Sequence, residues 1–188
     1  MASQLLVVMS AGPRLRNFFL ALRKGPAVTP ISTILVPTDF SHSSGEALEY
    51  ARGVATALGA SLHLFHVVEN PFVYGMYMEA YAALPADYVD SLDKTARTRL
   101  ETLLTPEEKD RLRAEFITQV GIPAREILDY LAAHPEVGLV IMATAGRGGV
   151  ARVVLGSVAD KIVRGAPCPV MTVHPQHRGE RLERTRAA

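Results

Sequence analysis

The sequence predicts a doubly wound α/β domain, built on a single five-stranded, parallel, Rossmann-like sheet with helices on both faces. Two observations lead to this fold class. Short runs that are apolar throughout alternate with segments of helical period, and strands without a polar face are typical of a parallel sheet covered on two sides. The chain has 188 residues, 48% of them apolar, which suits one domain with a substantial core.

The domain is expected to span residues 31–174, between two extensions. Residues 1–30 hold a short apolar run followed by a basic segment of helical period. A secretory signal has its charges before the apolar run, so we expect a flexible extension, with a membrane-surface anchor as the alternative. Residues 175–188 are polar and basic and are expected to form a mobile tail.

The first half of the domain has the pattern of a β–α–β unit. Residues 31–36 form a β-branched run and predict the first strand. Apolar residues then recur at helical spacing up to Gly59, which is expected to end the helix. Ser43 and Glu46 fit a capping box at its start. Residues 62–68 predict the second strand, reached by a right-handed crossover.

The second half repeats the alternation after an irregular segment. The stretch from Asn70 to Tyr88 has no clean period, so it is expected to be a long loop: a lid, a partner surface or an apolar cover. A charged helix is expected from Asp90 to about residue 113, with a possible interruption at Thr105-Pro106. The remaining expected elements are strands at residues 115–120, 137–143 and 170–173, a helix opened by Pro123 and stopped by Pro135, and a short helix at residues 157–164.

Composition excludes several classes of protein. The net charge of +1 gives no reason to expect nucleic acid as a partner. The single cysteine, Cys168, excludes an intrachain disulfide framework, indicates a cytoplasmic protein, and is expected to be a half-buried packing thiol. No window contains the roughly 20 consecutive apolar residues of a membrane span.

The candidate ligand site is expected where the strand order reverses, because such sheets bind ligands beyond the carboxyl ends of their strands at that point. In the order 3-2-1-4-5 the first and fourth strands are neighbours. Asp39 and a glycine-rich loop then share one crevice. The residues at these strand ends are Pro37, Thr38 and Asp39 after the first strand, Val67 at the end of the second, and Met142 to Gly149 after the fourth.

The glycine-rich loop has the chemistry of a phosphate-binding loop. Its glycines permit positive φ and let backbone N–H groups approach a phosphate, while Arg147 adds charge-assisted hydrogen bonds. Ser157, at a helix start, offers a hydroxyl and the positive end of the helix dipole, and Asp39 suits two ribose hydroxyls. The glycines concerned are Gly146, Gly148, Gly149 and Gly156.

A purely structural interpretation stays open for each of these features. Gly156-Ser157 followed by Asp160 also fits an ordinary helix cap, and Asp39 could cap the first helix. Other chemistries fail on spacing. The chain has no G-x-x-x-x-G-K-[ST] motif, and its formal G-x-G-x-x-A match at residues 146–151 follows the fourth strand rather than the first. The histidines show no metal-ligand spacing, and His66 is expected to be a satisfied core histidine.

Four segments taken in order resemble the universal stress protein family. They are ILVPTDFS at residues 34–41, LFHVV at 64–68, the glycine-rich loop, and APCPV at 166–170. The ATP-binding members of that family carry G-x2-G-x9-G-[ST]. Nine residues separate Gly146 from Gly156-Ser157, as the motif requires, whereas Ala143 stands in place of the first glycine.

The resemblance implies a dimeric, ATP-binding stress-response module with little or no turnover, with Mg²⁺ as a possible companion of the nucleotide. It implies that Asp39 holds the ribose, that the backbone of Val67 reads the adenine edge, and that a homodimer forms through Pro169 to Val173. The alternatives are a nucleotide-free interaction protein of the same fold and a slow ATPase. Under the implied roles, Met142 and Ala143 line the base and sugar, and Gly146, Gly156, Ser157 and Val158 cradle the phosphates.

Overall fold

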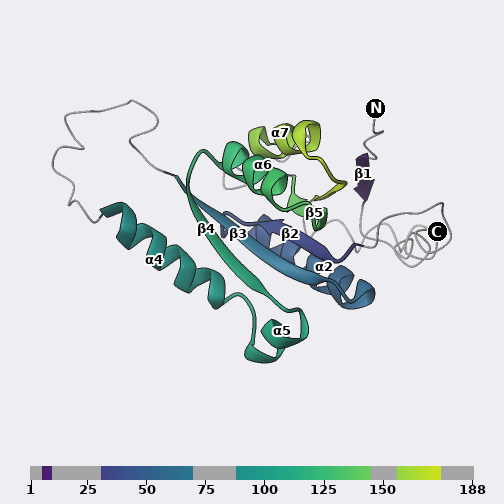
Figure 1. Ribbon diagram of the computed structural model, residues 1–188, viewed down its shortest axis with the longest axis horizontal. Helices are drawn as coiled ribbons and strands as arrows, with labels where there is room; N and C mark the ends of the chain where they lie inside the picture. Colours follow the sequence, from purple (N-terminus) through teal and green to yellow (C-terminus); the bar gives the residue numbers. More distant parts are fainter. Residues whose placement is uncertain (1–5, 10–30, 70–87, 145–155, 175–188) are drawn as a thin grey trace, which may run out of the picture.

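The computed structural model describes residues 6–9, 31–69, 88–144 and 156–174, which form an α/β sandwich around one sheet (Figure 1). The six strands are all parallel and lie in the order β1-β6-β5-β2-β3-β4. From β4 to β6 this is the predicted order 3-2-1-4-5, which is confirmed. The strands are β1 (Leu6–Met9), β2 (Thr33–Pro37), β3 (Ser61–Glu69), β4 (Glu115–Gly121), β5 (Val137–Ala143) and β6 (Val170–Val173).

The strand β1 is the one departure from the predicted sheet. It lies beside β6 and makes a sixth strand out of a segment that we expected to be part of a flexible extension. A run of four apolar residues has no periodicity that would distinguish a strand from a loop. Its partner strand also lies more than 150 residues further along the sequence, so no local pattern predicts the pairing.

Helices cover both faces of the sheet. On one face lie α2 (His42–Leu58), α4 (Tyr88–Glu101) and α5 (Pro106–Arg111), and on the other lie α6 (Pro123–Ala133) and α7 (Ser157–Gly165) (Figure 1). The strands supply both cores in alternation: Ile34 and Val36 of β2 face α2, whereas Leu35 faces α6 and α7. This alternation explains why the central strands β2 and β5 are almost entirely apolar in the sequence.

The helix boundaries depend on local chemistry. Gly59 ends α2 at φ 67°, a left-handed conformation that favours glycine, as predicted. The predicted capping box at Ser43 is wrong, because the hydroxyl that accepts from the backbone N–H of Ser44 belongs to Ser41. The chain leaves β2 through a tight turn, so the helix begins two residues earlier than the pattern suggested.

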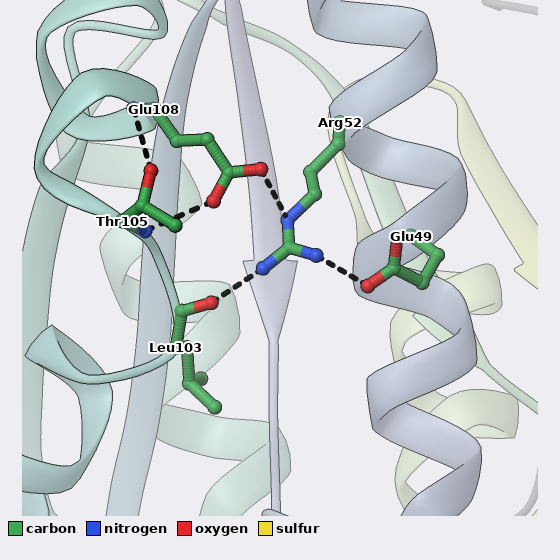
Figure 2. Close-up of polar contacts among 5 residues, drawn as sticks. All are labelled: Glu49, Arg52, Leu103, Thr105 and Glu108. Carbon is green, nitrogen blue, oxygen red and sulfur yellow. Dashed lines mark hydrogen bonds and ion pairs between the residues drawn. The ribbon is translucent and has the colours of Figure 1, made fainter.

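An arginine on α2 joins the helices of one face. The Arg52 guanidinium contacts Glu49 in its own helix, the Leu103 carbonyl after α4, and the Glu108 carboxylate of α5, with Nε and Oε1 3.5 Å apart (Figure 2). The same carboxylate accepts from the backbone N–H of Thr105 at 2.9 Å and completes a capping box at the start of α5. The interruption expected at Thr105 is thus confirmed, and Arg52 fixes it against α2.

Candidate functional site

The reversal of strand order lies between β2 and β5, so the carboxyl ends of these two strands are neighbours. Three groups of predicted residues meet at this edge of the sheet: the turn after β2, the end of β5, and the start of α7. Gly146, Arg147 and Gly149 lie outside the described residues. The described part of the site consists of the turn after β2, the end of β5 and the start of α7.

The turn after β2 is held by its own side chains. The Asp39 Oδ1 accepts from the backbone N–H of Ser41 at 3.0 Å, and the Thr38 Oγ1 accepts from the backbone N–H of Phe40 at 3.0 Å. Thr38 also donates its hydroxyl to the Ser44 Oγ at 3.0 Å. Asp39 therefore orients the turn and is not the cap of α2, which is Ser41.

A contact between the rings of Phe40 and His66 supports the same turn. Phe40 has φ 62°, an uncommon conformation for a bulky residue, and its ring centroid lies 4.3 Å from that of His66 on β3. The Arg99 guanidinium of α4 lies 4.3 Å from the Phe40 centroid, in cation–π range. The His66 Nδ1 is 2.8 Å from the Thr38 carbonyl oxygen, so Nδ1–H donates and fixes the ring tautomer. His66 is thus a satisfied histidine, as predicted, and it positions the backbone on which Asp39 stands.

The two ends of the glycine-rich loop are joined at its base. Gly156 donates its backbone N–H to the Thr144 carbonyl at 2.7 Å, and Thr144 donates its own N–H to the Val173 carbonyl at 2.9 Å. The Thr144 Oγ1 lies 3.1 Å from the His174 Nδ1, beyond the end of β6. Residues 145–155 therefore begin and end at one point of the sheet edge.

Helix α7 starts at this same point without a side-chain cap. Gly156 is its N-cap residue, in an extended conformation, and as a glycine it makes no side-chain cap hydrogen bond. Ser157 is exposed and Val158 is half-buried. The Asp160 carboxylate in the first turn binds the Arg164 guanidinium at 3.0 Å, and the position of Gly156 at the N-cap agrees with the purely structural interpretation of this sequence. The positive end of the α7 dipole faces the edge.

The remaining predicted residues have buried or half-buried side chains. Pro37, Val67 and Met142 are buried, and Ala143 is half-buried against the core. Sequence reasoning did not single out Phe40, Thr144 or His174. A threonine directly after an apolar strand was the available signal for Thr144, whereas the Thr144–His174 contact joins positions 30 residues apart and has no local signature.

A second polar group lies near the amino end of β3, away from this edge. The buried His63 Nδ1 lies 2.9 Å from the Tyr130 hydroxyl, and its Nε2 lies 3.7 Å from the Glu115 carboxylate. The Tyr130 ring stacks on that of His134, with centroids 3.8 Å apart. Burial raises the pKa of Tyr130 to about 12, and burial lowers the pKa of His63 against the opposing effect of Glu115 and Glu136. His63 and Tyr130 thus share one hydrogen bond inside the core.

Two searches within the described residues are negative. They contain no group of three or more potential metal ligands. None of their helices has the length and hydropathy needed to cross a bilayer. Cys168 is half-buried, and burial raises the pKa of its thiol, in line with the expected packing role.

Comparison with known proteins gives a consistent family. The model of the universal stress protein family matches residues 30–174. The universal stress protein MJ0531 of Methanocaldococcus jannaschii is 31% identical over 141 residues, covering 74% of this chain and 80% of that protein. The universal stress protein YxiE of Bacillus subtilis is 30% identical over 144 residues, covering 74% and 97%.

Solved structures agree with this result. The protein MJ0577, also from Methanocaldococcus jannaschii, superposes with a TM-score of 0.63 at 25% identity, covering 79% of this chain and 99% of that one. The universal stress protein UspA from Lactobacillus plantarum gives 0.58 at 25%, covering 78% and 99%. A universal stress protein solved in complex with cAMP gives 0.53 at 24%, covering 79% and 100%.

The fold defines the class of doubly wound α/β proteins, with the reversal of strand order between β2 and β5. Within that class, this chain belongs to the universal stress protein family.

Proposed function

We propose that this chain binds ATP at the carboxyl edge of β2 and β5 and acts as a stress-response module with little or no turnover. One observation carries the proposal: Asp39 follows β2, and α7 begins at Gly156, which is bonded to Thr144 at the end of the neighbouring strand β5. A carboxylate and the backbone N–H groups of a helix start are the two kinds of group that a ribose and a phosphate chain require.

The proposed roles follow from the surroundings of each residue. Asp39 would accept from ribose hydroxyls, since an ionised carboxylate is an acceptor for hydroxyl donors and this one lies in the turn directly after β2. Pro37, Thr38, Met142 and Ala143 would border the base and sugar, and the backbone of Val67 would read the adenine edge. The phosphates would lie on Gly146, Arg147, Gly149, Gly156, Ser157 and Val158, accompanied by Mg²⁺.

Three further points support the proposal. A protein of the same fold has been solved with cAMP, another adenine nucleotide. Ala143, in place of the first motif glycine, is a β5 residue whose backbone makes ordinary sheet pairing, so its methyl group meets no conformational barrier there. The single cysteine is compatible with the cytoplasmic location that we propose.

Calorimetry with ATP and Mg²⁺ tests the proposal. We expect the wild-type chain to bind ATP and Asp39→Ala to lower the affinity at least about tenfold, which corresponds to about 1.4 kcal/mol. Asp129→Ala is the matched control, because Asp129 is an exposed carboxylate on α6 paired with Arg125. Circular dichroism confirms that each variant is folded. Absence of binding by the wild type, or full binding by Asp39→Ala combined with Gly146→Val, would contradict the proposal.

A further inference from the structure

The edge of the sheet beyond β6 is occupied by the chain's own N-terminal strand. The parallel register pairs Leu6 with Val170 and Met9 with Val173, so β1 covers β6 along its whole length. Without β1, β6 would be the last strand of the sheet. Its outward backbone N–H and C=O groups would then face solvent.

Both faces of β6 are already covered by helices. Met171 and Val173 pack in the core beneath α2, and Val170 packs in the core beneath α6 and α7. All four side chains of β6 are buried. A partner at this position therefore gains main-chain hydrogen bonds rather than side-chain contacts, and the element that fits such an edge is another strand.

The opposite end of the sheet is protected differently. There β4 carries Glu115, Gln119 and Val120 as exposed side chains, one charged, one polar and one apolar, and α4 packs beside it. Charged and polar side chains on an edge strand discourage pairing with another chain. The VMTV sequence of β6 contains no charge. Of the two ends, the β6 end is the one that depends on a cover.

We propose that β1 is a detachable cover that competes with a second copy of this chain for the edge of β6. With β1 in place the chain is monomeric. With β1 displaced, two copies pair β6 against β6, antiparallel about a twofold axis, an arrangement in which each copy offers the other the same surface. The homodimer expected through Pro169 to Val173 thus forms only after β1 leaves.

Tethering explains why the cover holds under ordinary conditions. A strand in the same chain acts at an effective concentration on the order of millimolar, whereas a second copy at micromolar concentration is about a thousandfold more dilute. Equal strands would therefore favour the cover. A factor that removes β1, such as a partner for the N-terminal segment or its cleavage, would release the edge and permit dimerisation.

The full-length chain provides the test, by sedimentation velocity and light scattering without nucleotide. We expect the wild type at the mass of one chain, 20.4 kDa. Val7→Pro combined with Val8→Pro should double that mass, because consecutive residues of a strand direct their N–H groups to opposite sides and one of the two prolines must remove a bond to β6. The matched control, Val7→Ala combined with Val8→Ala, keeps both N–H groups and should stay monomeric.

A peptide of residues 1–12, added in excess to the double-proline variant, should restore the monomer, whereas a scrambled peptide should not. Several outcomes would overturn the proposal: a dimeric wild type, a double-proline variant that stays monomeric, or a dimer that the peptide leaves unchanged. Unfolding of the double-proline variant, seen by circular dichroism, would also overturn it, because β1 would then be part of the core fold rather than a detachable cover. None of these outcomes depends on nucleotide binding.

Discussion

The two histidines of β3 lie three residues apart and face opposite sides of the sheet. His63, near the amino end, is 5% exposed and bonds to the side chain of Tyr130. His66, near the carboxyl end, is half-buried and bonds to the backbone carbonyl of Thr38. One histidine binds another side chain inside the core, whereas the other holds the turn that carries Asp39. The same residue type therefore serves stability at one end of the strand and positioning at the other.

The largest effect on the free energy of unfolding is expected at the amino end of β3, around His63. Tyr130→Phe leaves the buried His63 Nδ1 without its partner, and the free energy of unfolding should fall by about 1–3 kcal/mol. Urea unfolding measures the change. Tyr50→Phe is the control, because Tyr50 is half-buried on α2 and should change stability by less than about 0.5 kcal/mol. Equal losses in the two variants would show that the His63–Tyr130 bond contributes nothing specific.

A smaller loss of stability is expected at the carboxyl end of β3, around His66, together with a separate effect on ATP binding. His66→Leu removes the donor to the Thr38 carbonyl and should cost about 0.5–1.5 kcal/mol of unfolding free energy. It should also weaken ATP binding, while Tyr130→Phe should leave the affinity unchanged. His66→Asn, whose amide N–H can take the place of Nδ1–H, should recover part of both losses. If His66→Leu bound ATP like the wild type, His66 would be only a packing residue.

The smallest effect is expected from pH. Because burial lowers the pKa of His63 in the folded chain below its usual 6.5, the unfolded chain binds more protons between the two values. The contribution to stability is therefore full above pH 6.5 and is lost as pH falls toward the folded pKa. Each unit of pKa shift corresponds to about 1.4 kcal/mol.

Unfolding measured at pH 7.5 and 5.0, compared between the wild type and His63→Gln, isolates this contribution from those of Glu115, Glu136 and His134, which face the same group. The wild type should lose more stability on acidification than the variant does. A pH dependence identical in the two proteins would show that His63 does not titrate differently in the folded chain.

Local patterns could be predicted from the sequence, whereas contacts between distant positions could not. Strands that are buried on both faces and helices with a clean period are local signals, so β5 and β6 were predicted at their observed bounds. The start of α2 was misplaced because three serines compete for the cap and only the turn at Phe40 selects Ser41. The pairing of β1 with β6 and of Thr144 with His174 joins distant positions, and such contacts leave no periodic trace.

The closure of Thr144 on Gly156 has a consequence for how this family can vary. A loop whose two ends already meet can change length with little penalty, since each doubling of a flexible loop costs only about 0.6 kcal/mol. The strand pairing of the sheet does not depend on the length of this loop. An insertion between Thr144 and Gly156 should therefore cost little folding stability, so the nine-residue spacing after Gly146 is not a requirement of the sheet.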